Sequence, residues 1–309
     1  MTKVLITGGS GFVGKALLDH PYFSNATVVG RSNINQNKNF IYCALDKNFD
    51  LTDELSKVDV VIHLAARAHL MKDDAKDPLF EYRKINTDAT IKLVKQAINC
   101  GVKRFIYISS IKVLGEETSE NKAYKEHDAK IPKDFYGISK AEAENSIIDL
   151  TRNCKMDYVI IRPPLIYGNG VKGNFQRLIN LTSTPIPLPL GSINNKRSYV
   201  SVENLVDLIF VCSEHPNAVN QIFHVSDDAD ISTTELLNIL IKAGGYKARL
   251  FNFNATLLKI LFYLIGMKKV YQRLFSSLQV DITHAKTTLE WQPKYKIDEF
   301  FARNLSSND

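Results

Sequence analysis

Residues 4–14 read VLITGGSGFVG, in which an apolar run passes directly into a glycine-rich loop. The run Val4–Ile6 predicts a buried parallel strand. Gly8, Gly11 and Gly14 have the spacing G-x-x-G-x-x-G, which permits a tight turn and lets backbone N–H groups approach a pyrophosphate at a helix N-terminus. The stretch therefore predicts the first strand, turn and helix of a nucleotide-binding α/β fold.

A second pattern, Y-x-x-x-K, is formed by Tyr136 and Lys140. Residues four apart lie on one face of a helix. A nearby ammonium group stabilises a tyrosinate, so we expect Lys140 to lower the pKa of Tyr136 and to make it a usable general acid or base. Ser109 and Ser110 follow the apolar run 103–108. They are expected at the carboxyl end of another strand, where open α/β sheets bind their ligands.

Apolar runs alternate with helical patterns as far as Arg162, which predicts βαβ units and a Rossmann-like, doubly wound parallel sheet. The predicted strands are 4–7, 27–30, 58–64, 103–109 and 158–162. One helix is expected over 78–100, with an Asp-Pro start and Gly101 as its stop. A second long helix should run over about 136–153.

The pattern changes after residue 164. Residues 184–191 read TPIPLPLG, and their prolines exclude a central strand or a helix. Ser232 and Glu235 have the spacing of a capping box at a helix start. We expect an NAD(P)-binding Rossmann domain and a smaller C-terminal substrate-binding lobe. Their predicted ranges are 1–165 with parts of 195–226 for the first, and 166–194 with about 227–309 for the second.

Composition limits the class of protein. Hydrophobic residues make up 45% and charged residues 23% of the chain, which is ordinary for a soluble globular protein. The net charge of +6 comes without a long basic run, so we expect no nucleic-acid partner. The cysteines form no C-x-x-C pair, and the apolar start reads as a strand, so we expect no secretory signal. Reduced thiols in a cytoplasmic protein and no metal site are therefore expected.

One very apolar stretch, Leu257–Gly266, is shorter than the roughly 18 residues that a membrane-spanning helix needs. We therefore expect no transmembrane segment. The first interpretation is a buried helix of the second domain. The alternative is a patch that docks peripherally on a membrane or on a membrane enzyme.

Together these motifs resemble the extended short-chain dehydrogenase/reductase family, in its NAD-dependent epimerase/dehydratase branch that acts on nucleotide sugars. The match covers nearly the whole chain. Besides the glycine loop, the serine pair and the Y-x-x-x-K pattern, it includes His63–Ala66, Asn86 with Thr90, Arg162-Pro163, Tyr167-Gly168 and Leu289–Trp291. The resemblance implies that Tyr136 is the general acid/base, that Ser110 holds the reacting oxygen and that Lys140 binds the nicotinamide ribose.

The resemblance also implies which residues contact the cofactor, NAD or NADP. They are Gly8, Gly11, Phe12, Val13, Gly14, Arg31, Leu64, Ala65, Ala66, Asn86, Ser109, Tyr136, Lys140, Pro163 and Leu165. NAD-using relatives carry an acid after the second strand for the ribose 2′-hydroxyl, whereas this chain has Arg31. Arg31 could pair with a 2′-phosphate, which would favour NADP, or lie exposed at the strand end. His63 lies inside a strand and is expected to be a core residue rather than a catalytic one.

The resemblance implies a UDP-sugar substrate, with substrate-binding residues at Arg67, Ser110, Lys112, Asn174, Phe175, Arg197 and Arg273. A bidentate guanidinium suits a diphosphate, so Arg197 and Arg273 are its candidates. Ile111-Lys112 replaces the Asp-Glu pair of nucleotide-sugar 4,6-dehydratases, so water elimination is not expected. Leu165 replaces the asparagine of the family's Arg-x-x-Asn motif.

The resemblance implies a nucleotide-sugar C4 oxidoreductase of bacterial surface-polysaccharide (O-antigen) synthesis. The first hypothesis is a UDP-hexose or UDP-N-acetylhexosamine 4-epimerase. The alternatives are an NAD(P)H-dependent 4-keto reductase of a UDP-4-keto-6-deoxy-hexosamine (UDP-QuiNAc/FucNAc type) and a non-catalytic NAD(P)-sensing protein. A homodimer is expected through the two long helices, where surplus apolar surface should come from Ile91, Leu93, Val94, Ile147 and Ile148.

Overall fold

The computed structural model describes residues 2–33, 37–46, 48–67, 75–119, 122–171 and 173–305. Its central element is a seven-stranded parallel sheet in the order β3-β2-β1-β4-β5-β6-β10. The strands are β1 (Val4–Thr7), β2 (Thr27–Gly30), β3 (Phe40–Tyr42), β4 (Val60–His63), β5 (Arg104–Ile108), β6 (Asp157–Arg162) and β10 (Gln221–His224). The strand order reverses between β1 and β4, where doubly wound sheets bind their ligands. The predicted fold class is confirmed.

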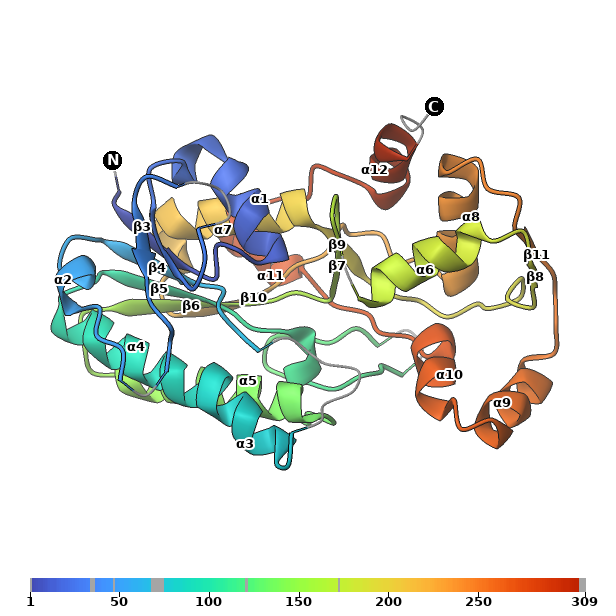
Figure 1. The fold of residues 1–309 in the computed structure, drawn as a ribbon, viewed down its shortest axis with the longest axis horizontal. Helices are drawn as coiled ribbons and strands as arrows, with labels where there is room; N and C mark the ends of the chain where they lie inside the picture. The colour runs from blue at the N-terminus through green and yellow to red at the C-terminus, as the bar shows by residue number, and fades with distance from the viewer. Residues whose placement is uncertain are drawn as a thin grey trace.

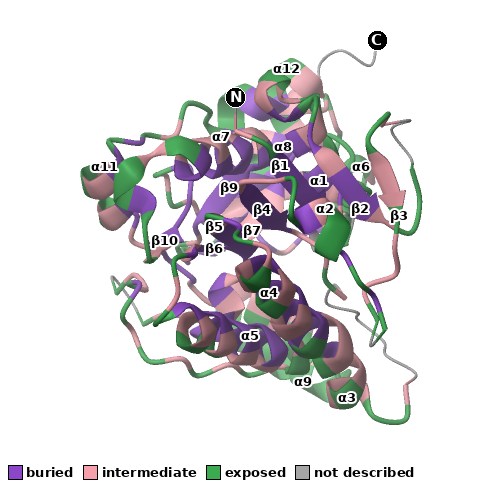
Figure 2. Ribbon diagram, turned by 90° about the vertical axis from the view of Figure 1, so that its left-hand side faces the viewer, coloured by how far each residue is buried: buried purple, intermediate pink, exposed green. Residues whose placement is uncertain are grey.

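Helices cover both faces of this sheet (Figure 1). One face carries α1 (Phe12–Asp19), α7 (Val202–Glu214) and α11 (Thr283–Leu289). The other carries α2 (Thr52–Leu55), α3 (Pro78–Arg83), α4 (Ala89–Asn99) and α5 (Phe135–Thr151). Successive side chains of a strand alternate, so Ile6 packs into the first layer and Leu5 into the second. Figure 2 shows the buried strands between the two helical layers.

The five predicted strands are confirmed, with ends displaced by one or two residues. The sheet edges β3 and β10 were not predicted, because each is short and half of its residues or more are only partly buried. The predicted helix over 78–100 is interrupted, since a π-helical turn over Lys84–Asp88 separates α3 from α4. Gly101, with a φ of 76°, follows the end of α4 as expected.

Three of the residues expected to supply a dimer surface belong instead to the core of this chain. Leu93, Val94 and Ile147 are fully buried against the sheet. Ile91 and Ile148 are half-buried. The expected surplus of apolar surface on these helices is therefore wrong, because the sheet face itself covers most of it.

The remaining elements lie at one end of the large sheet (Figure 1). The strand pairs are β7 (Leu165–Tyr167) with β9 (Tyr199–Ser201), and β8 (Pro187–Leu188) with β11 (Arg249–Leu250). The helices are α6 (Asn174–Ser183), α8 (Thr233–Ala243), α9 (Ala255–Leu264), α10 (Lys268–Phe275) and α12 (Ile297–Asn304). The capping box of Ser232 and Glu235 is confirmed at the start of α8. The division of the chain into two domains stays a prediction.

The apolar stretch 257–266 forms most of α9, and it is not buried. Leu258 is 3% exposed, whereas Leu257 is 55% and Leu264 is 80% exposed. The expected buried helix is therefore wrong, because α9 lies at the outer edge of the molecule with α10 beside it (Figure 1). No helix within the described ranges is both long and apolar enough to cross a membrane.

Candidate functional site

Close backbone contacts hold the loop between β1 and α1. Gly8 has a φ of 77°, and a Cβ atom there would lie 2.6 Å from the backbone nitrogen of Ala65. A Cβ atom on Gly14 would lie 2.3 Å from the carbonyl oxygen of Gly8. Gly11 donates its N–H to the same carbonyl at 3.0 Å. The glycines therefore allow the turn to pack directly against the end of β4.

The N-terminus of α1 fits the pyrophosphate of a dinucleotide. Gly11 is the N-cap, no side chain caps the helix and no acidic residue lies in its first turn. The helix therefore presents backbone N–H donors and the positive end of its dipole to an anion. Ala65 and Ala66 at the end of β4 add only methyl groups beside this turn. The ring of Phe12 points elsewhere, to within 3.1 Å of where a Cβ atom on Gly168 would lie.

His63 is a core residue, as expected. Its Nδ1 lies 2.6 Å from Thr7 Oγ1 and its Nε2 lies 2.9 Å from Thr90 Oγ1, so the ring joins β4 to β1 and α4. Burial, with a smaller contribution from Lys140, lowers its pKa to about 3. The ring is therefore neutral at pH 7 and ties the sheet to a helix rather than taking part in proton transfer.

Asn86 lies in the π-helical turn and is fully buried. Its Oδ1 accepts the backbone N–H of Arg67 at 2.7 Å. Its Nδ2 donates to the carbonyl of Arg67 at 3.2 Å and to Ser139 Oγ at 3.0 Å. Asn86 thus fastens the segment after β4 to α5. The guanidinium of Arg67 lies 5.4 Å from the centre of the Tyr82 ring.

The two residues of the Y-x-x-x-K pattern lie one turn apart on α5. The helix starts at Asp134, whose side chain accepts the N–H of Gly137 at 2.7 Å. The ammonium of Lys140 donates to the carbonyl of Ile108 at 2.8 Å and lies 4.4 Å from the centre of the Tyr107 ring. Lys140 therefore joins α5 to the end of β5, directly before the serine pair.

The pKa values at this site differ from the expectation. Burial raises the pKa of Tyr136, and the Asp134 carboxylate and Tyr82 raise it further. Burial lowers the pKa of Lys140 to about 7, although Glu144 opposes this shift. The expected lowering of the Tyr136 pKa by Lys140 is wrong for this structure, because burial and the Asp134 carboxylate both disfavour the tyrosinate. Tyr136 is a protonated phenol at neutral pH.

A buried ion pair fixes α5 to the end of β6. Glu144 accepts from Arg162 Nε at 2.9 Å and from Arg162 Nη2 at 2.7 Å, and neither side chain is more than 1% exposed. Lys130 Nζ lies 2.9 Å from the same carboxylate. Burial alone would raise the pKa of Glu144, but Arg162 and Lys130 hold it below its ordinary value. The pair lies one helical turn beyond Lys140 and sets the position of α5 on the sheet.

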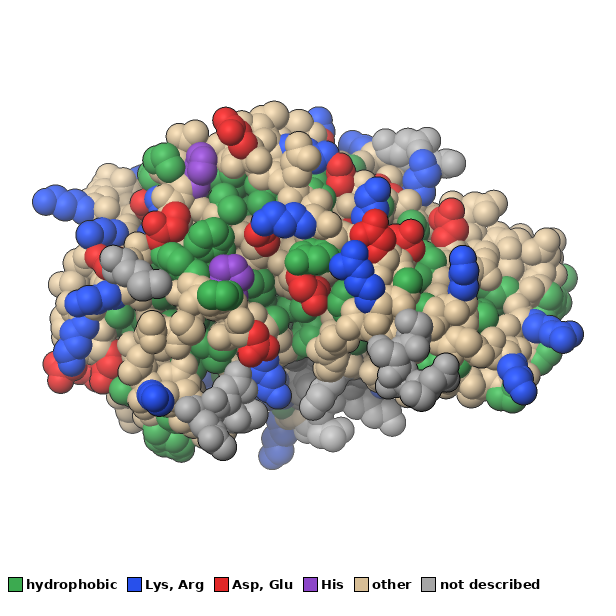
Figure 3. Space-filling view, turned by 90° about the horizontal axis from the view of Figure 1, so that it is seen from above, with side chains coloured by type: hydrophobic (Ala, Val, Ile, Leu, Met, Phe, Trp, Pro, Cys, Tyr) green, Lys and Arg blue, Asp and Glu red, His purple; other side chains and the backbone are tan. Residues whose placement is uncertain are grey.

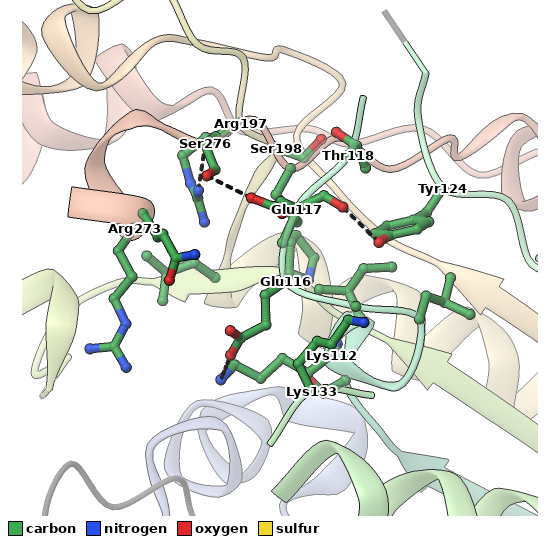
Figure 4. A pocket seen from close by; sticks show the side chains of 18 of the residues that line it. Lys112, Glu116, Glu117, Thr118, Tyr124, Lys133, Arg197, Ser198, Arg273 and Ser276 are labelled. Carbon is green, nitrogen blue, oxygen red and sulfur yellow. Dashed lines mark hydrogen bonds and ion pairs between the residues drawn. The ribbon is translucent and has the colours of Figure 1, made fainter. Parts of the chain in front are cut away.

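Several predicted residues line one cavity of about 1290 Å³ (Figure 4). They are Ser110, Lys112, Tyr136, Leu165, Arg197 and Arg273. The sequence analysis did not name Arg177 and Lys269, which also line this cavity. Arg177 lies one turn after Asn174 in α6, so helical periodicity could have indicated it. Lys269 had no such signal, because nothing in the sequence places α10 at the cavity.

Neighbouring groups hold two of the cations that line the cavity, Lys112 and Arg197. Lys112 forms an ion pair with Asp134 and lies 3.1 Å from Glu116, so it is tied to the start of α5. Arg197 donates to the carbonyl of Ser276 at 2.7 Å. Figure 4 shows Arg197 and Arg273 on the side of α10, with Lys112 and Glu116 together on another side. An anion and an uncharged sugar could therefore occupy different parts of the cavity.

Other predicted residues lie apart from this cavity. Phe175 is fully buried and stacks on Phe301, so it is a core side chain. Ser109 is buried beside Glu144. Arg31 is exposed directly after β2. The side chain of Asn174 lies outside the described part of the structure.

A profile of the NAD-dependent epimerase/dehydratase family matches residues 4–226, a range that contains Ser110, Tyr136 and Lys140. The chain belongs to this family. A family member from Vibrio cholerae named UDP-glucose 4-epimerase is 44% identical, over 99% of this chain and 95% of the relative.

Two solved structures share the fold. The UDP-N-acetylglucosamine 4-epimerase from Bacillus cereus is 19% identical with a TM-score of 0.78, and the match covers 98% of each chain. A UDP-glucuronic acid 4-epimerase from Bacillus cereus, in complex with NAD, is 22% identical with a TM-score of 0.77 and covers 97% of this chain and 94% of the other.

Proposed function

We propose that this family member is a nucleotide-sugar C4 epimerase whose substrate is a UDP-hexose or a UDP-N-acetylhexosamine. The observation that carries the proposal is the single cavity lined by Ser110, Tyr136, Arg197 and Arg273. The first two suit the interconversion of an alcohol and a carbonyl, and the two arginines suit a diphosphate. The 44%-identical Vibrio cholerae relative, which is named for this reaction on UDP-glucose, supports the proposal.

The residues of the site have separate roles in this proposal. The β1–α1 loop would hold NAD or NADP, whose nicotinamide would take up hydride from C4 of the sugar and return it to the same carbon. Tyr136 exchanges a proton with the C4 oxygen, and the Ser110 hydroxyl holds that oxygen in place. Lys140 fixes the nicotinamide ribose and joins α5 to the strand that carries Ser110. Arg177, Arg197 and Arg273 bind the diphosphate of the nucleotide.

Lys112 argues against water elimination. Elimination from the sugar needs a carboxylic acid and a carboxylate beside the reacting carbons, whereas this position carries an ammonium paired with Asp134 and Glu116. Neither Ile111 nor Lys112 can replace that acid–base pair. The chemistry is therefore proposed to stay at C4.

One observation supports a 4-keto reductase as the second candidate. Leu165 lines the cavity where the family motif has an asparagine, so one polar contact to the sugar is replaced by an apolar one.

One pair of assays decides between the candidates. The purified protein is incubated with UDP-glucose or UDP-N-acetylglucosamine without added cofactor, and in parallel with a UDP-4-keto-6-deoxy sugar plus NADH or NADPH. Epimerisation in the first arm supports the proposal. Stoichiometric oxidation of NAD(P)H in the second arm alone supports the reductase. Loss of water from the sugar, or failure to bind UDP in calorimetry, would contradict both.

We further propose that the protein is a cytoplasmic homodimer of bacterial surface-polysaccharide synthesis. The free thiols of its cysteines suit a reducing compartment. Phe80 is 50% and Phe135 is 47% exposed at the starts of α3 and α5, which pack side by side, so a second copy could cover both rings. Light scattering at micromolar concentration should give twice the chain mass, and a monomer would contradict the dimer.

A further inference from the structure

The apolar side chains of α9 and its C-terminal turn form an exposed surface. It consists of Leu257, Ile260, Leu261, Leu264, Ile265 and Met267, and we call it the α9 patch. Each of these residues is at least 41% exposed, and Leu264 reaches 80%. Single exposed apolar residues need no explanation, but a contiguous apolar surface on a globular protein marks a site of interaction.

The segment of the chain that contains the α9 patch carries charge of one sign. Residues 236–280 contain seven Lys and Arg residues and no Asp or Glu. The net charge of the whole chain is +6, so all the other residues together carry −1. On the face shown in Figure 3, acidic and basic side chains are interspersed over most of the surface, whereas those visible at the end that carries β8 and β11 are basic. The basic surplus of the molecule therefore lies in the segment of the chain that contains the patch.

Aromatic rings and ammonium groups adjoin the patch. The Nζ atoms of Lys259 and Lys268 lie 5.9 and 5.4 Å from the centre of the Tyr263 ring. Tyr263 is 42% exposed, and Phe251 and Phe253, which precede α9, are 43% and 40% exposed. An apolar face with amphipathic rings and lysines at its border is the composition of helices that lie in the headgroup region of a membrane.

We propose that the α9 patch docks on the surface of an anionic phospholipid bilayer, with α9 parallel to the membrane plane. The helix of ten residues is about 15 Å long, so it can enter the interface but cannot cross the hydrocarbon. The positive charge of residues 236–280 favours an anionic bilayer over a second copy of the chain as the partner of the patch. Two copies that met through the patch would bring two segments of charge +7 together. Anionic headgroups attract Lys259 and Lys268, which adjoin the patch.

Docking through α9 would place the cavity close to the membrane. α10 packs beside α9, and its residues Lys269 and Arg273 line the cavity. No residue of the α9 patch lines it. The docking surface and the proposed active site are therefore separate, and each can be tested without the other.

The test is co-sedimentation of the full chain with lipid vesicles. One vesicle preparation is phosphatidylcholine alone, and the other contains equal parts of phosphatidylcholine and phosphatidylglycerol. We expect binding to the anionic vesicles that weakens as sodium chloride is added, and much weaker binding to the neutral ones. Leu261→Glu and Leu264→Glu should each weaken binding about tenfold or more. Lys259→Gln and Lys268→Gln should each weaken it about fivefold, on anionic vesicles only.

The matched control is Tyr42→Glu, which places the same carboxylate on a side chain that is 74% exposed on the edge strand β3. This variant should bind vesicles as the unchanged chain does. Circular dichroism and UDP binding check that the α9 variants are folded. Absence of vesicle binding by the unchanged chain would overturn the proposal, as would equal binding by Leu264→Glu. An oligomer in light scattering that Leu264→Glu dissociates, without vesicle binding, would show that a second copy covers the patch and would also overturn it.

Discussion

Tyr136 and Lys140 show how burial changes a motif's chemistry. From their spacing alone, the ammonium should stabilise a tyrosinate. In the structure, Lys140 is buried and its pKa falls to about 7, while the pKa of Tyr136 is raised. The lysine instead contacts the carbonyl of Ile108 at the end of β5. Its first role is thus to position α5, and its charge depends on what lies beside it.

Replacing the Tyr136 hydroxyl tests the acid/base assignment. We expect Tyr136→Phe to fold and to bind cofactor but to lose about 10²–10⁴-fold in turnover, because proton transfer by a positioned side chain contributes that much. Tyr82→Phe is the matched control, since its ring lies 6.2 Å from that of Tyr136 and the same change removes a hydroxyl from the same region. Steady-state kinetics with a UDP-sugar measure both variants. Turnover of Tyr136→Phe equal to that of the control would refute the assignment.

Arg31 tests the choice between NADP and NAD. Its side chain is exposed directly after β2, where family members that use NAD carry an acid. We expect Arg31→Asp to lower the affinity for NADP relative to NAD, because a carboxylate repels a 2′-phosphate and accepts a hydrogen bond from a ribose hydroxyl. Titration of both cofactors measures the ratio of the dissociation constants. Arg152→Asp, an exposed arginine at the end of α5, is the control. An unchanged ratio in Arg31→Asp would mean that Arg31 does not face the ribose.

Some site residues could be predicted from the sequence because local rules govern them. The glycine loop is such a case, since its spacing alone requires the close approach seen at Gly8 and Gly14. The core role of His63 followed from its place inside a strand. Helical periodicity could have indicated Arg177, whereas the place of Lys269 at the cavity depends on how distant helices pack. The pKa of Lys140 depends on burial, which spacing does not give.

The helices and strands also differ in how well the sequence predicts them. Strands buried on both faces were predicted almost to their ends, because their apolar runs are continuous. The edge strands β3 and β10 lack that signal. The α9 helix was predicted to be buried because burial is the usual fate of an apolar run, and the error arose because hydropathy does not say what covers a helix. The exposure of the apolar side chains of α9 is the observation that supports membrane docking.

The ion pair between α5 and β6 offers a test at the scale of elements. We expect Glu144→Gln to lower the free energy of unfolding by about 3–5 kcal/mol, because it leaves the buried charge of Arg162 without its partner. Glu142→Gln on the same helix is the control, since its pair with Arg83 is partly exposed and is worth about 0–1 kcal/mol. Urea denaturation measures both changes. Equal effects of the two substitutions would contradict the role given to the buried pair.

The stability of the whole molecule should depend on pH through its buried titratable groups. His63 on β4 and His224 on β10 both have a pKa lowered to about 3, chiefly by burial. An unfolded chain binds a proton at each near pH 6.5, so the folded state binds fewer protons between about pH 3 and 6.5 and loses stability as the pH falls through that range. Asp227 acts in the opposite direction, because burial raises its pKa to about 6. The pH dependence of the wild-type free energy of unfolding therefore combines opposite contributions from Asp227 and the two histidines. It cannot show the histidine contribution alone.

A comparison of variants isolates His63. We expect His63→Gln to be less stable than wild type at pH 7, because glutamine fits the contacts to Thr7 and Thr90 less well. The difference should shrink by up to about 1.4 kcal/mol per pH unit as the pH falls from 6.5 toward 4.5, because only wild type must keep a histidine unprotonated. His127→Gln, at an exposed position, should show a constant difference over the same range. Urea denaturation at several pH values gives the three curves. A His63→Gln curve parallel to that of wild type would mean that the buried ring does not couple folding to protonation.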